Sequence, residues 1–111
     1  MIDIVTTRRG SATVLRPEGR LNMVAAGEVR RAVAELVESG TPRLVVDLGG
    51  TTFLDSSGLG SLVAGLKTAR QAGGDLRIAA AADQALLVLR LTNLDRVLKP
   101  HDTVEDALDG W

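Results

Sequence analysis

A short apolar run, R-L-V-V-D-L at residues 43–48, limits the possible folds of this chain more than any other feature. Its apolar residues are contiguous and lack helical spacing, which is typical of a strand buried on both faces of a parallel sheet. Such a strand needs covering layers on both sides of the sheet. Amphipathic patterns with helical spacing precede and follow it, from residue 24 to S-G at 39–40 and from the serine pair at 56–57 to G-G at 73–74. The chain is therefore predicted to be an α/β protein.

The rest of the chain continues this alternation. Residues 1–7 and 12–18 are β-prone runs around R-R-G-S, which predicts an opening antiparallel hairpin, and G-G-T-T at 49–52 is assigned to a turn. The later segments are predicted as a strand at 76–80, a helix at 83–94, a short strand at 96–98 and a closing helix at 103–108. We expect a single domain over residues 1–111: the hairpin, then consecutive β-α units, forming a mixed four- to five-stranded sheet with helices and right-handed crossovers.

The composition excludes several classes of function. With 13 basic and 14 acidic residues the formal net charge is −1, and one Phe, one Trp and no Tyr leave few platforms for base stacking, so nucleic acid is not an expected partner. No cysteine and a single histidine argue against a metal site. No signal peptide opens the chain and no apolar run approaches the about 20 residues that span a bilayer. We therefore expect a cytoplasmic protein without a membrane partner.

The stretch F-L-D-S-S-G-L-G at residues 53–60 is the main candidate site. Its simplest interpretation is a helix cap, because Asp and Ser side chains accept hydrogen bonds from the free N–H groups of a first helical turn. A serine nucleophile would need G-x-S-x-G and an activating histidine, but the surroundings do not match and the only histidine is His101. A phosphate-binding loop fails too, because Leu66 stands where its lysine should be. No enzymatic activity is expected.

The remaining interpretation is that a serine itself receives a phosphate. Phosphorylation adds a charge of about −1.5 to −2, which backbone N–H groups at a helix start tolerate, whereas burying that charge unpaired in an interface costs several kcal/mol. Glycines at 58, 60 and 65 lie on the same predicted helix. They indicate close approach of another backbone, either in the packing of the helix on its own sheet or in access for a kinase and a partner protein.

The run V-V-D-L-G-G-T-T-F-L-D-S-S-G-L-G-S-L-V-A-G-L at 45–66, followed by G-G-D-L-R-I at 73–78, resembles the anti-sigma factor antagonist family, a branch of the STAS domains. The resemblance covers nearly the whole chain and implies a bacterial partner-switching protein. In that family the unmodified antagonist binds an anti-sigma factor, itself a serine kinase of the histidine-kinase-like ATPase fold, and so frees the sigma factor. Phosphorylation by the kinase separates the complex, and a metal-dependent serine phosphatase resets it.

For this chain the resemblance implies phosphorylation at Ser56, with Ser57 as second choice. Partner-binding or site-supporting roles fall on Asn22, Asp55, Ser57, Gly58 and Gly60. No cofactor is expected, because ATP and magnesium would belong to the kinase. Family members commonly carry G-E-L-D where this chain has G-R-L-N at 19–22. Arg20 could pair with the phosphate or simply be a solvated side chain beside a turn.

Two alternatives stay open on the sequence. One is a non-switching STAS interaction subunit of a stress-signalling or lipid-transport assembly, in which the serine is only a cap. The other is a phospho-aspartate receiver domain, suggested by Asp47 at a strand end and by Lys99-Pro100. A receiver needs an acidic pair after its first strand, where this chain has Arg8-Arg9. This chain also lacks the carboxylates that the magnesium ion of a receiver domain requires.

Overall fold

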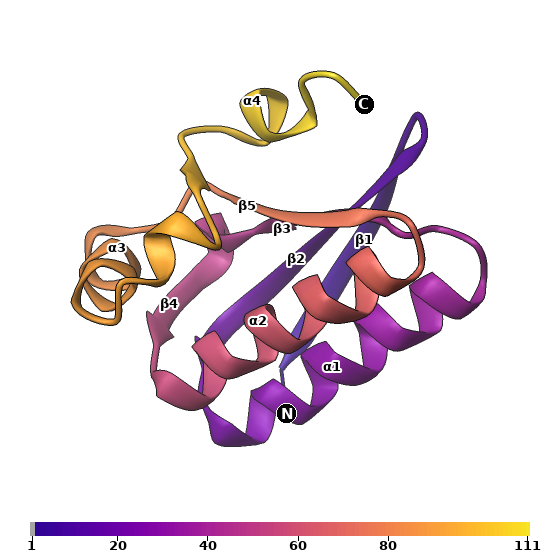
Figure 1. Cartoon of the computed structure of the whole chain (residues 1–111). Helices are drawn as coiled ribbons and strands as arrows, with labels where there is room; N and C mark the ends of the chain where they lie inside the picture. Colours follow the sequence, from indigo (N-terminus) through magenta and orange to yellow (C-terminus); the bar gives the residue numbers. More distant parts are fainter. Residues whose placement is uncertain (1) are drawn as a thin grey trace.

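A computed structural model describes residues 2–111 and shows a six-stranded sheet with helices packed on it (Figure 1). The strands are β1 (Asp3–Arg9), β2 (Ala12–Leu21), β3 (Arg43–Asp47), β4 (Thr51–Leu54), β5 (Asp75–Ala79) and β6 (Pro100–His101). The α-helices are α1 (Met23–Glu38), α2 (Ser56–Gln71), α3 (Asp83–Leu91) and α4 (Val104–Leu108). Two short 3-10 helices, η1 (Leu48–Gly50) and η2 (Leu94–Arg96), complete the list of elements.

The sheet is mixed, and its main path runs β1-β2-β3-β5-β6. Among the strands of the described residues, only β1 and β2 pair antiparallel, as the predicted opening hairpin, and Gly10 in their turn has a φ of 62°. Met1, which the sequence placed in the first strand, lies outside the described residues. The other strand pairs are parallel. The predicted α/β class and mixed sheet are confirmed, and β4, which pairs with β2 off the main path, adds a sixth strand.

Strand β2 is long enough to pair with two parallel strands in addition to β1. Its residues 13–15 pair with β3, and its residues 19–21 pair with β4 beyond a register shift between Gly19 and Arg20. The assignment of G-G-T-T to a turn was therefore wrong for Thr51 and Thr52, which begin β4. Four residues carry too little local pattern to show a strand, and their pairing partner lies some thirty positions earlier in the chain. This pairing brings the ends of β2 and β4 together.

The predicted strand at 96–98 was also wrong. Helix α3 ends at Leu91, and Asn93 adopts a left-handed conformation with a φ of 58°, so the chain turns into η2 instead of extending. The Val97 N–H then donates to the Leu94 carbonyl at 3.1 Å. Extended pairing with β5 begins only at Pro100, in β6. The predicted closing helix is confirmed as α4, where the Thr103 hydroxyl accepts from the Asp106 N–H.

Strand β3 is buried on both faces, as its contiguous apolar run predicts. Leu44 and Val46 belong to the larger core, which includes residues of α1, α2 and α3, while Val45 belongs to a smaller core with α4. All three side chains are 0% exposed. Figure 1 shows α1 and α2 side by side on one face of the sheet and α4 on the opposite face.

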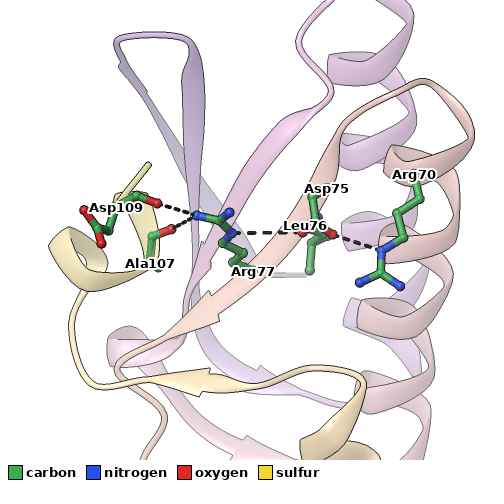
Figure 2. A network of polar contacts seen from close by, with 6 residues as sticks. All are labelled: Arg70, Asp75, Leu76, Arg77, Ala107 and Asp109. Carbon is green, nitrogen blue, oxygen red and sulfur yellow. Dashed lines mark hydrogen bonds and ion pairs between the residues drawn. The ribbon is translucent and has the colours of Figure 1, made fainter. Parts of the chain in front are cut away.

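A row of polar contacts ties α4 and the end of the chain to β5 (Figure 2). The Arg77 guanidinium donates to the carbonyls of Ala107, at 2.8 Å, and Asp109, at 2.9 Å. On its other side Arg77 lies 4.0 Å from Asp75, which also pairs with Arg70 of α2 at 3.1 Å. These contacts hold the short helix that covers the second face of the sheet.

Candidate functional site

Helices α1 and α2 begin next to each other at one edge of the sheet (Figure 1). Helix α1 follows β2 and α2 follows β4, and these strands are parallel neighbours with Leu21 opposite Leu54. The Asp55 N–H reaches the Leu21 carbonyl at 3.4 Å. Two helical N-termini, each with its own cap, therefore share one surface.

The two caps are built in the same way. Asn22 Oδ1 accepts a hydrogen bond from the Ala25 N–H at 3.2 Å, and Asp55 Oδ1 accepts one from the Gly58 N–H at 2.8 Å. The predicted cap role of Asp55 is confirmed. Asn22 keeps the capping oxygen that an aspartate would supply but removes its negative charge, so the surface beside Ser56 is less acidic than G-E-L-D would make it.

The two candidate serines differ in accessibility. Ser56 is the first residue of α2 and its side chain is exposed, whereas Ser57 is half-buried. Neither hydroxyl makes a hydrogen bond to another of residues 2–111. A modifying enzyme would therefore meet the Ser56 hydroxyl first.

The glycines of α2 have different surroundings. A Cβ at Gly58 would collide with the Leu21 carbonyl oxygen, so the close approach of another backbone that the sequence indicated occurs here. A Cβ at Gly65 would lie 3.0 Å from Leu76 of β5, which also reflects packing. At Gly60 the nearest neighbour is the Nη2 atom of Arg30, 3.6 Å from the Cβ position. Gly60 therefore leaves the side of α2 open toward a cation of α1.

Gln84, which no local sequence pattern marks as a site residue, binds the backbone of Leu54, the residue before the Asp55 cap. Its Nε2 donates to the Leu54 carbonyl at 2.7 Å, and its Oε1 accepts from the Leu54 N–H at 2.9 Å. The side-chain amide thus satisfies both backbone groups on the side of β4 that faces away from β2. Gln84 and Leu54 are thirty positions apart, so no local pattern could have paired them.

Exposed apolar side chains lie at the start of α1, which is next to the start of α2. Met23 is 74% exposed and Val24 is 66% exposed, both in the first turn of α1. Val24 also lines a hollow of ≈ 350 Å³, and Arg20, another of its lining residues, places its guanidinium 4.4 Å from the Phe53 ring centroid. Exposed apolar side chains gathered beside polar ones are typical of protein-binding surfaces.

The described part of the chain lacks the features of a metal site, of a receiver-type phosphorylation site and of a membrane-spanning helix. Among residues 2–111, no three His, Cys, Asp or Glu side chains are grouped so that they could hold a metal ion. Asp47, the candidate receiver aspartate, is instead engaged by Arg16 at 3.0 Å and by the Gly49 N–H at 2.9 Å. None of the helices over this range has the length and apolar character to cross a membrane.

Comparison with known proteins identifies the family. The model of the STAS domain family matches residues 3–107. The chain belongs to the STAS domain family. This STAS chain is 31% identical, over 97 residues and 86% of each chain, to a Thermotoga maritima protein that carries a provisional name as an anti-sigma factor antagonist. It is also 27% identical to the anti-sigma-F factor antagonist RsfB of Mycobacterium tuberculosis, over 98% of this chain and 88% of that protein.

The solved structures agree with the family. A crystal structure of a Thermotoga maritima protein with the same provisional name superposes with a TM-score of 0.88 and 27% identity, covering 96% of this chain and 92% of the other. The predicted STAS fold is therefore confirmed, and the receiver alternative is excluded on fold.

Proposed function

We propose that this STAS domain is an anti-sigma factor antagonist whose binding is switched by phosphorylation of Ser56. The unmodified form binds an anti-sigma factor that is a serine kinase of the histidine-kinase-like ATPase fold, and so releases a sigma factor in the cytoplasm. The kinase transfers the γ-phosphoryl group of ATP to the Ser56 hydroxyl oxygen, with loss of the hydroxyl proton and release of ADP. A metal-dependent serine phosphatase removes the phosphate. The domain is a binding protein with no cofactor and no enzymatic activity of its own.

The observation that carries this proposal is the exposed Ser56 at the start of α2, next to the start of α1, which carries the exposed Met23 and Val24. A partner that covers the apolar pair would lie next to the start of α2, because α1 and α2 begin next to each other (Figure 1). A phosphate at the helix start contributes a favourable about 0.3–1 kcal/mol, so it leaves the fold intact. Buried unpaired under a partner, the same phosphate costs several kcal/mol, which corresponds to roughly a thousandfold in affinity.

The proposal is tested by capturing the partner with unmodified protein from the native cell extract and then adding ATP and magnesium. We expect release of the partner with phosphate mapped to Ser56. Ser56→Ala should bind the partner and should not release it when ATP is added. Ser57→Ala should still be phosphorylated and should still release the partner. Ser56→Asp should bind more weakly, measured by titration calorimetry with the purified partner.

Ser11→Asp is the matched charge control, because Ser11 lies in the β1–β2 turn at the opposite end of β2 from α1 and α2. It should bind like the unmodified protein. Equal affinities of the unmodified protein, Ser56→Ala and the authentic Ser56 phosphoprotein would rule out the switch. That result would favour the non-switching interaction subunit.

A further inference from the structure

Arg30 of α1 is a cation that lies against the exposed side of α2. Its Nη2 atom is 3.6 Å from the position that a Cβ of Gly60 would take, and the arginine is exposed. Within residues 2–111 the Arg30 side chain has no ion pair and no hydrogen bond. Gly60 has no side chain to fill this place, so the guanidinium can lie directly over the helix.

Ser56 and Gly60 lie on the same face of α2, because they are four residues apart. Side chains at this spacing have Cβ atoms about 5–6 Å from each other. The guanidinium at Gly60 is therefore one helical turn from the Ser56 side chain. Rotation of the phosphoserine and arginine side chains together can close the distance between the phosphate and the guanidinium. Neither helix has to move.

No acidic residue of α1 competes for Arg30. The positions three and four residues away on the helix are Ala26, Gly27, Val33 and Ala34. The neighbouring Arg31 differs, because Glu28 stands three residues before it and Glu35 four residues after it. Near the serine, the Asp55 carboxylate already accepts from the Gly58 N–H. The Arg20 guanidinium lies over the Phe53 ring instead.

We infer that Arg30 binds the phosphate of phosphorylated Ser56 and so links α1 to α2 in the modified state. This inference rests on the proposed phosphorylation of Ser56. Phosphorylation then changes the surface twice, because it adds a dianion and removes the free cation that Arg30 presents in the unmodified state. An acidic group of the partner that pairs with Arg30 would lose its counterion on phosphorylation.

The test uses full-length protein in which phosphoserine is incorporated at position 56 during translation, so it needs neither the kinase nor the partner. The second pKa of the phosphate is followed by phosphorus NMR in the parent and in Arg30→Gln, Arg31→Gln and Arg20→Gln. A guanidinium that binds the phosphate stabilises the dianion, so the parent should have the lowest pKa. Arg30→Gln should raise the pKa by about half a unit or more, while Arg31→Gln and Arg20→Gln should leave it near the parent value.

Two results would overturn the inference: an unchanged phosphate pKa in Arg30→Gln, or an equal rise in all three variants, which would indicate only a general effect of surface charge. Arg30→Lys restores the positive charge and should recover part of the shift. Failure of the proposed function looks different, because Ser56 would then stay unmodified in cells while the incorporated phosphate still responded to Arg30.

Discussion

At the scale of single residues, two helical glycines have opposite surroundings. A Cβ at Gly58 would collide with the Leu21 carbonyl oxygen, whereas a Cβ at Gly27 of α1 would meet no atom within 4 Å. Neither glycine has a positive φ, so both backbones suit alanine. The difference between the two sites is therefore one of space alone.

This contrast predicts opposite effects of the same substitution. Gly27→Ala should raise the free energy of unfolding by about 0.5–1 kcal/mol, because alanine loses less backbone entropy in a helix. Gly58→Ala should lower it by about 1–3 kcal/mol, because β2 or α2 must shift to make room for the methyl group. Urea denaturation of both variants measures the two changes. A stable Gly58→Ala variant would contradict the close contact with Leu21.

At the scale of elements, the Gln84 side chain of α3 bonds the free edge of β4 in the way that a neighbouring strand would. Gln84 supplies the acceptor and the donor that a further strand would offer to Leu54. Asp55 and Ser56 follow Leu54 directly, so α3 helps to position the start of α2. The same contact leaves both backbone groups of Leu54 unavailable for pairing with a strand of another chain.

Gln84→Ala should therefore loosen the junction between β4 and α2. Loss of both partners of the buried Leu54 backbone should lower the free energy of unfolding by about 1–3 kcal/mol and speed hydrogen exchange of the Leu54 amide. Gln71→Ala is the matched control, since Gln71 is exposed at the end of α2 and its side chain makes no hydrogen bond within residues 2–111. Equal exchange rates at Leu54 in the two variants would count against this role of Gln84.

At the scale of the whole molecule, the second face of the sheet is covered by a helix of five residues, α4. So short a helix is marginal by itself in water, so its contacts must hold it in place. Arg77 provides several of them, because its guanidinium donates to the carbonyls of Ala107 and Asp109. The guanidinium carbon also lies 3.8 Å from the Trp111 ring centroid. Release of α4 would uncover Val45.

Arg77→Gln should detach α4 from the sheet more often than in the parent. Hydrogen exchange in residues 104–111 should rise by about tenfold or more, because hydrogen bonds from a charged donor are lost. Emission of the single tryptophan, Trp111, should shift to the red as the ring meets more water. Arg43→Gln is the control, since within residues 2–111 the Arg43 side chain donates only to the Ser11 hydroxyl, at 3.1 Å. An unchanged emission spectrum in Arg77→Gln would argue against the role of Arg77 in holding α4 on the sheet.

Much of the fold follows from local patterns in the sequence. Helical spacing located α1, α2 and the start of α3, and the run at 43–48 located the doubly buried β3. The Asp55 cap and the exposure of Ser56 also follow from one short stretch, because capping joins atoms only three residues apart. The errors at β4 and at 96–98 concern very short segments, whose structure depends on distant pairing and on a single left-handed residue, Asn93.

The sequence by itself determined which segments form helices, where α2 begins, and that a strand with helices on both sides must lie at the centre. Only the tertiary structure decided which elements are neighbours at the site. It placed the starts of α1 and α2 together, joined Gln84 to Leu54 and laid Arg30 beside Gly60. The physical reason is that periodicity and capping act over a few residues, whereas these contacts join residues thirty positions apart, which only the packing of the whole sheet brings together.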